Sequence, residues 1–382
     1  MSIYSTSLLL YANILLVAGA AVAVNIETTA VGNPGNEGEL SGSGAGGYGP
    51  DRVCGSVSYA YNVGKYEVTA GQYTAFLNAV AGVDSYGLYN TDMWSDSYGC
   101  KIERFAGTGT VGDPYRYRVA GDWANRPVNY VSWGDAARFA NWLHNGQPAG
   151  AQDVSTTEDG AYYLNGTTSY LPLLGVVREA GWKWAIPTED EWYKAAYYDP
   201  ATASYYDYPT STNTAPGYVN DSGNLSGAGG VFVEGGSDPG NYATHDGDVG
   251  IDGIGSPYYR TQVGEWENSD SPYGTFDQGG NVWEWNEAIV HGSFRGVRGG
   301  SFYYSSNILR ASSRDNDYPT SEFHDLGFRV VQVPEPTAML LLGLGSAGVL
   351  VRRREVGRYP YGSLSGISLH PRTDQQLLAH GQ

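Results

Sequence analysis

The 382-residue chain contains only two cysteines, Cys54 and Cys100. No Cys-x-x-Cys pair is present, which excludes a zinc site built from paired thiolates. Two cysteines in an exported chain are able to form one disulfide. The sequence does not fix the distance between their Cα atoms, so a Cys54–Cys100 disulfide and a pair of free thiols both stay open.

Positive charge is also scarce. Lysine and arginine number 22 against 40 aspartates and glutamates, which gives a net charge of −18. A phosphate backbone would be repelled, so a nucleic-acid partner is excluded. Acidity of this kind favours either solubility outside the cell or the binding of divalent cations.

Common catalytic motifs are missing from the sequence. There is no G-x-S-x-G, Walker or H-E-x-x-H pattern. His291 and His324 have no metal-ligand partner at a recognisable spacing. His245 stands among aspartates in a segment predicted to be a solvated loop, with a metal site as the alternative. By contrast, tyrosine is abundant at 32 residues and glycine at 54. We therefore expect many turns and many amphipathic aromatic contacts, which binding surfaces favour.

The N-terminal end resembles an export signal. Residues 8–23 form an apolar run that closes on Ala21-Val22-Ala23, an A-x-A pattern typical of signal peptidase sites. The preceding residues carry no lysine or arginine, but the run is short for a spanning helix. Residues 1–23 are therefore predicted to be a signal peptide, followed by an N-terminal segment over 24–57.

The C-terminal end combines VPEP at 333–336, an apolar run over 337–351 and three arginines at 352–354. This arrangement resembles a PEP-CTERM sorting signal with a transmembrane helix, over 333–355. The basic cluster would stay cytoplasmic under the positive-inside rule. The resemblance implies transient anchoring in the inner membrane, processing by an exosortase-type enzyme, and delivery to the cell envelope or extracellular matrix. A simple C-terminal anchor is the alternative, and residues 356–382 are predicted to be a disordered tail.

Between these ends the sequence predicts few helices. Three helix starts combine a hydroxyl residue with a polar residue three positions later, and apolar residues follow at helical spacing. The predicted caps are Thr69, Ser132 and Thr188. Short β-prone runs lie at 128–131, 231–233 and 328–331, and residues 201–262 are predicted to form long loops. This pattern predicts one α+β domain over 58–332, with little regular structure and loops that need a clamp.

Six motifs follow one another in this region. They are VGKYEVT at 63–69, RPVNYVSW at 126–133, IPTEDEW at 186–192, GGNVWEW at 279–285, RGGSF at 298–302 and GFRV at 327–330. Their order resembles the formylglycine-generating enzyme family and its sulfatase-modifying-factor relatives. The resemblance implies a C-type-lectin-like formylglycine-generating-enzyme fold, with short antiparallel strands, long loops and structural calcium.

The resemblance also implies where calcium would bind. One ion would take side-chain and carbonyl oxygens from Asp277, Gly280, Val282 and Glu284. The alternative is that Asp277 caps a turn and Glu284 pairs with an arginine. A second ion would be held by Asn241, Tyr242, Asp252 and Ile254, with Asp246 and Asp248 as competing candidates. Four arginines are predicted to be internal ion-pair or carbonyl partners, with a binding role as the alternative: Arg298, Arg310, Arg314 and Arg329.

The family's oxidase chemistry needs two cysteines after the GGS segment, where they bind copper(I). Those positions hold Tyr304 and Leu309 here, so copper is not expected and no catalytic residue is assigned. Ser301 matches a family residue near the active site, but without an adjacent base it is not a nucleophile.

Two functions remain open. The first is a calcium-stabilised binding or structural module for a glycan or an exported protein. The alternative is a divergent oxidoreductase-type enzyme that modifies exported proteins.

Overall fold

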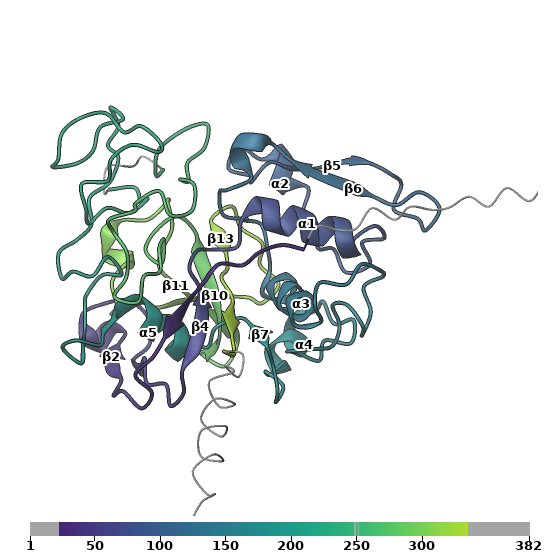
Figure 1. Cartoon of the computed structure of the whole chain (residues 1–382), viewed down its shortest axis with the longest axis horizontal. Coiled ribbons are helices and arrows are strands. Elements are labelled where there is room, and N and C mark those ends of the chain that lie inside the picture. The colour runs from purple at the N-terminus through teal and green to yellow at the C-terminus, as the bar shows by residue number, and fades with distance from the viewer. Residues whose placement is uncertain (1–22, 248–249, 251, 335–382) are drawn as a thin grey trace, which may run out of the picture. The chain divides into compact units, whose positions relative to one another are not determined.

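The structure is a computed structural model that describes residues 23–247, 250 and 252–334 (Figure 1). The predicted signal peptide up to Val22, the apolar part of the sorting signal and the predicted tail lie outside these residues. Across the described ranges, no helix combines the length and apolar character that a bilayer crossing requires.

The three predicted helices are confirmed. They are α1 (Ala70–Val80), α3 (Trp133–His144) and α5 (Glu189–Tyr197), and each begins with a complete capping box. At each start the hydroxyl accepts the N–H three residues later, while the side chain of that later residue accepts the cap N–H. Two short helices were not predicted from the sequence: α2 (Asp92–Ser95) and α4 (Tyr170–Gly175).

Helices α1 and α3 lie side by side (Figure 1). Phe76 of α1 meets Phe139 of α3 with ring centroids 5.3 Å apart, and Phe139 also contacts Phe328 at 5.3 Å. All three rings are fully buried. These edge-to-face contacts join the helices to the segment just before β14, and they form the centre of the largest hydrophobic core.

Two four-stranded sheets organise the domain. The first has the order β1-β4-β14-β7, and the second has the order β12-β11-β10-β13, with β12 at an edge. The strands of the first sheet are β1 (Thr28–Val31), β4 (Tyr61–Gly64), β14 (Val331–Gln332) and β7 (Trp184–Ala185). Those of the second are β12 (Asp315–Asp317), β11 (Phe294–Arg298), β10 (Trp283–Val290) and β13 (Leu326–Gly327).

Short hairpins and turns complete the fold. The paired strands are β2 (Glu39–Ser41) with β3 (Arg52–Cys54), β5 (Ile102–Ala106) with β6 (Arg116–Val119), and β8 (Tyr198–Asp199) with β9 (Ser204–Tyr205). The 3-10 turns are η1 (Ser43–Ala45), η2 (Gly121–Trp123) and η3 (Ser306–Ile308). The described residues between β9 and β10 form neither helix nor strand, which agrees with the predicted long loops. Few helices, short strands and long loops confirm the α+β class.

Several sequence predictions need correction. Residues 128–131 form no strand, because Tyr130 adopts a φ of 58° that interrupts an extended chain. The run at 231–233 makes a single bridge at Val231, and of 328–331 only the last residue joins a strand. The N-terminal segment over 24–57 stays a prediction in its bounds, and it contributes β1, which pairs with β4 along its whole length.

Candidate functional site

The two positions where the family carries cysteines lie in different surroundings. The Tyr304 ring is 38% exposed and stands against Trp283, with ring centroids 5.6 Å apart. Leu309 is fully buried in a separate cluster with Tyr208 and Ala243. Neither side chain supplies a thiolate, and Tyr304 lines a cavity.

That cavity is a cleft of about 260 Å³ over the second sheet. Its lining is mainly aromatic and acidic: Trp283, Val297, Tyr303, Tyr304, Asp315, Asn316, Asp317, Phe323, His324, Asp325 and Leu326. Tyr303 and Phe323 are 47% and 49% exposed, so they offer open rings to a ligand. The volume falls just below the roughly 300–1,000 Å³ typical of pockets that engulf a small molecule. The cleft therefore suits one ring or one side chain of a longer ligand.

Three aspartates of the cleft come from two elements. Asp315 and Asp317 are two residues apart on the edge strand β12, which directs them to the same face, and Asp325 directly precedes β13. Burial raises the pKa of Asp315, and the nearby charges of Asp317 and Asp325 raise it further. The cleft is therefore a region of concentrated negative charge.

Ser301 lies behind the cleft. Its hydroxyl is fully buried and donates to Asp325 Oδ2 at 3.0 Å, while it accepts the Tyr303 N–H at 3.2 Å. His324 lines the cleft, and its Nε2 is buried without a hydrogen-bond partner. The sequence prediction assigned no role to His324 or Asp325, because neither belongs to a motif with a recognisable spacing.

The residues predicted to bind the first calcium ion surround a buried group of acids. Glu284 accepts two hydrogen bonds from Arg329, at 2.5 and 2.6 Å, and one from Trp192 at 2.7 Å. Asp277 accepts the Gly264 N–H at 2.6 Å. These contacts match the alternative arrangement, in which Glu284 pairs with an arginine and Asp277 serves a turn.

Glu67, from the first family motif, completes this group and was not predicted. It accepts hydrogen bonds from the Val282 N–H and from the Asn281 side-chain amide. Burial is the largest cause that raises its pKa, and the nearby charges of Asp277 and Glu284 raise it further. Burial likewise raises the pKa of Asp277 to about 6. Only Glu284 of the three is hydrogen-bonded to an arginine, so the excess negative charge suits a divalent cation.

A cation there would also need carbonyl oxygens. Within the described residues, no three His, Cys, Asp or Glu side chains gather closely enough to hold a metal by themselves. The carbonyls of Gly280 and Val282 are the further donors that the prediction names. The negative charge of Glu67, Asp277 and Glu284 fits a calcium ion. Such an ion would share the Glu284 carboxylate with Arg329, which already donates to both of its oxygens.

The residues of the predicted second calcium site have separate partners. Asn241 accepts the Thr210 hydroxyl at 2.7 Å, and Asp252 accepts the Tyr98 hydroxyl at 2.6 Å. Tyr242 packs on Trp266, and the Ile254 N–H donates to the Tyr259 carbonyl. Asn241 and Tyr242 are adjacent in the chain, and Ile254 packs against the hydrophobic cluster that contains Tyr242 and Trp266.

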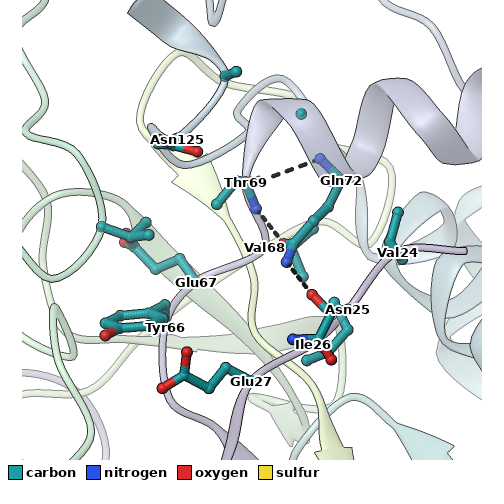
Figure 2. A pocket seen from close by; sticks show the side chains of 13 residues that line it. Val24, Asn25, Ile26, Glu27, Tyr66, Glu67, Val68, Thr69, Gln72 and Asn125 are labelled. Atoms are coloured by element: carbon teal, nitrogen blue, oxygen red, sulfur yellow. Dashed lines mark hydrogen bonds between the residues drawn. The ribbon is translucent and has the colours of Figure 1, made fainter. Parts of the chain in front are cut away.

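A second cavity, of about 380 Å³, lies beside the start of the folded chain (Figure 2). The Gln72 side chain points toward Asn25 and donates to its carbonyl at 2.8 Å. Val24 is bound in a similar way, since its N–H donates to Gln147 Oε1 at 2.7 Å and its carbonyl accepts Gln147 Nε2 at 2.9 Å. The N-terminal segment itself, from Val24 to Glu27, forms part of the wall of this cavity.

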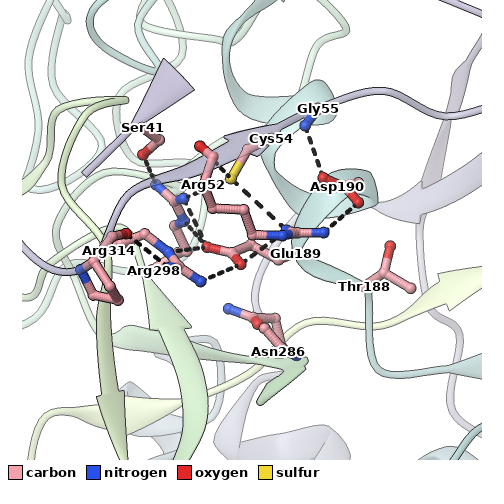
Figure 3. Close-up of polar contacts among 12 residues, drawn as sticks. Ser41, Arg52, Cys54, Gly55, Thr188, Glu189, Asp190, Asn286, Arg298 and Arg314 are labelled. Carbon is pink, nitrogen blue, oxygen red and sulfur yellow. Dashed lines mark hydrogen bonds and ion pairs between the residues drawn. The ribbon is translucent and has the colours of Figure 1, made fainter. Parts of the chain in front are cut away.

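A buried ionic cluster surrounds Glu189 at the start of α5 (Figure 3). Arg298 and Arg314 each donate two hydrogen bonds to its carboxylate, and Arg52 adds one at 2.9 Å. Arg298, Arg314 and Arg329 are internal ion-pair partners, as predicted. Arg310 is not, because its side chain is exposed and donates to the Tyr208 hydroxyl at 2.8 Å.

Cys54 belongs to the same cluster and accepts the Arg298 Nη2 at 3.2 Å. Of the two alternatives that the sequence left open, the structure holds free thiols, since Cys54 and Cys100 are both buried and unbridged. The physical reason is that they occupy different cores: Cys54 packs with α5, whereas Cys100 packs with α1 and α3. Burial raises the pKa of the Cys54 thiol to about 11.

Comparisons with known proteins agree with this architecture. Residues 55–334 match the family model described as the sulfatase-modifying factor enzyme 1-like domain, and residues 332–354 match the PEP-CTERM protein-sorting motif. Hercynine oxygenase of Mycobacterium tuberculosis is 25% identical over 273 residues, which make up 68% of this chain and 49% of that protein. The chain therefore spans about half the length of this curated relative.

Solved structures with a similar course of the chain have low sequence identity. Treponema denticola variable protein 1 is 20% identical, with 80% of this chain and 95% of that one covered, at a TM-score of 0.45. PvdO from Pseudomonas aeruginosa is 17% identical, with 80% and 94% covered, at a TM-score of 0.42. Similarities of this size say nothing about function.

Proposed function

Because the chain belongs to the family of sulfatase-modifying factor enzyme 1-like domains, we propose that it keeps the family's domain as a binding module and lacks the family's oxidase reaction. The ligand site is the aromatic and acidic cleft around Tyr304. The ligand is a glycan. The observation that carries this proposal is the lining of the cleft, which holds four aromatic side chains, three aspartates and one asparagine, but no thiol.

The cysteine positions support a non-catalytic role. The sequence contains no cysteine after Cys100, and Tyr304 and Leu309 stand where the family's thiolates are expected. Cys54 and Cys100 are both buried away from the cleft lining, and burial raises the pKa of each thiol. A protonated, buried thiol is neither a nucleophile nor a copper ligand.

The aromatic rings support a glycan. Sugar rings present apolar C–H faces edged by hydroxyl groups, so their sites combine open aromatic faces with carboxylate and amide oxygens. Tyr303, Tyr304 and Phe323 offer the first, and Asp315, Asp317 and Asn316 offer the second. Large, rigid aromatic side chains also lose little conformational entropy on binding, which suits a shallow site.

Export places the module outside the cell. The PEP-CTERM motif at 332–354 supports export, membrane-associated sorting and processing by an exosortase. The envelope or extracellular matrix as the final location is part of the proposal. Glycans are abundant there, which agrees with the proposed ligand.

Calcium is proposed as a structural clamp of the loop before β10. Asp277 and Glu284 would supply carboxylate oxygens, and Gly280 and Val282 would supply carbonyl oxygens. The unpaired negative charge of Asp277 and the neighbouring Glu67 supports this proposal. The ion would neutralise the buried acids and stiffen the segment that leads into the cleft floor at Trp283.

A direct test measures glycan binding by the full chain on a glycan array, followed by calorimetry with the best ligand. Tyr304→Ala should weaken the binding by about 5- to 30-fold, since a stacked aromatic ring contributes on the order of 1–2 kcal/mol. Tyr163→Ala is the matched control, because this tyrosine is 54% exposed and does not line the cleft. Glycan binding that Tyr304→Ala leaves unchanged would place the site elsewhere.

Metal analysis of the same purified protein distinguishes the binding module from the alternative, a divergent oxidoreductase that modifies exported proteins. His324 is the observation that keeps this alternative testable, because its Nε2 is buried without a partner beside the cleft. Metal analysis of the purified chain should find neither copper nor iron in stoichiometric amount. A redox metal that is lost in His324→Ala would favour the enzyme.

A further inference from the structure

The charge of the cleft is one-sided. Asp315, Asp317 and Asp325 line it, together with His324, and no lysine or arginine belongs to the lining. The chain as a whole carries a net charge of −18. A cation near this cleft is the buried Arg260, which donates to the His324 carbonyl at 3.3 Å and does not line the cleft. A ligand with carboxylate or sulfate groups would meet like charges, which cost free energy in a partly desolvated site.

Each of the three carboxylates keeps an oxygen available. Asp315 Oδ1 accepts the Asn316 N–H, Asp317 Oδ1 accepts the Tyr318 N–H and the Ser321 hydroxyl, and Asp325 Oδ2 accepts the Ser301 hydroxyl. The second oxygen of each has no donor from another residue of the described chain. These hydrogen bonds hold the carboxylates in place and leave three acceptors for a ligand.

Aromatic rings stand next to these acceptors. Tyr303 lies 6.0 Å from Tyr304 and 5.4 Å from His324 between ring centroids, and both contacts are edge-to-face, so the three rings form one aromatic wall with faces in different directions. An ammonium group beside such rings gains a cation–π attraction in addition to its hydrogen bonds to carboxylates. When the ammonium group belongs to an amino sugar, the sugar ring would also contact these aromatic side chains. When it belongs to a lysine, the long side chain would lose rotamer entropy on binding.

We propose that the cleft selects glycans whose sugar residues carry free, protonated amino groups, such as de-N-acetylated glucosamine. This inference rests on the proposed function and names its ligand class. The amine donates to the free carboxylate oxygens of the aspartates, and the ring packs on Tyr303 and Tyr304. N-acetylation removes the charge and adds bulk, so it should prevent this contact.

The test is calorimetry of the full chain with three oligosaccharides of equal length: glucosamine, N-acetylglucosamine and glucose oligomers. The glucosamine oligomer should bind about tenfold or more tightly than either of the others, because hydrogen bonds to charged groups exceed neutral ones by that margin. Its affinity should fall as salt is raised. Asp317→Asn should remove most of the preference, whereas Asp113→Asn, on the exposed turn between β5 and β6, should leave it intact.

The outcomes separate the two claims. Equal affinity for the three oligomers would overturn the amine selectivity and leave glycan binding in place. Binding of none of them, with Tyr304→Ala and the unaltered chain alike, would overturn both. A lysine peptide that binds as tightly as the glucosamine oligomer would also overturn the inference, since the cleft would then recognise charge without a sugar ring. Asp325→Asn provides a second variant if Asp317→Asn does not fold.

Discussion

Arg298 Nη2 lies 2.7 Å from Glu189 Oε1, and both side chains are buried. The pair joins the end of β11 to the first residue of α5, so it connects the sheet beneath the cleft to a helix from a distant part of the sequence (Figure 3). Arg314 and Arg52 converge on the same carboxylate. One acid therefore holds three cationic side chains in place.

Removal of that acid should be costly. Glu189→Gln leaves Arg298 and Arg314 buried without their counter-charge, and the loss of one partner from a buried pair costs about 3–5 kcal/mol. Equilibrium unfolding in urea measures the change. Glu27→Gln is the matched control, because Glu27 pairs with Lys65 at the surface, where a salt bridge contributes about 0–1 kcal/mol. Similar losses in the two variants would contradict the role assigned to the cluster.

Because of Glu189, the unfolding free energy should also depend on pH in the acidic range. Burial alone would raise the pKa of Glu189, but Arg298, Arg314 and Arg52 outweigh it and lower the pKa to about 2. In the unfolded chain its pKa is close to 4.5, so the unfolded state binds more protons between these values. The stabilisation is complete above about pH 4.5 and is lost as the pH falls toward 2, on the order of 3 kcal/mol. Unfolding free energies measured across this range should show a slope that Glu189→Gln reduces.

Calcium removal gives a third prediction. The purified chain should retain about one calcium ion by mass spectrometry, and a chelator should lower its melting temperature by several degrees. Asp277→Asn should abolish both effects, while Asp113→Asn should preserve them. If the chelator changes neither metal content nor melting temperature, the acids around Glu67 are neutralised by protonation, and the calcium assignment is wrong.

The attachment of Val24 to the folded domain should depend on its two hydrogen bonds with the Gln147 side chain. Gln147→Ala removes both hydrogen bonds to Val24, at about 1 kcal/mol each, so residues 24–27 should become the preferred site of limited proteolysis. Gln262→Ala is the control, because its side chain makes only a long contact of 3.4 Å with Asn125.

N-terminal sequencing of exported protein should also find Val24 first, after cleavage at Ala23.

Local signals in the sequence determined the most reliable predictions. The hydroxyl residues Thr69, Ser132 and Thr188 satisfy backbone N–H groups only three residues away, so a short window of sequence is sufficient to place these helices. The strand prediction at 128–131 failed because Tyr130 adopts a positive φ. The neighbouring Asn129 side chain donates to the carbonyls of Tyr98 and His324, and no local pattern contains such contacts.

The cleft could not be predicted for a related reason. Its walls come from the start of β10, from the loop after β11, from β12 and from the turn before β13, which meet only when the second sheet forms. The sequence identified Tyr304 through the family pattern, but Asp325 and His324 had no signal of their own. Glu67 was within a recognised motif, yet its burial beside Asp277 depends on the fold of both segments.

Asp315 and Asp317 lie on β12, whose outer edge has no neighbouring strand in the second sheet. An open edge offers its backbone groups to any extended chain, and charged side chains are one means by which proteins prevent such pairing. Two carboxylates on so short a strand would repel the identical edge of another copy. A protein crowded on an envelope could thus keep its cleft free for ligand, because the charges that line the cleft also oppose association between sheets.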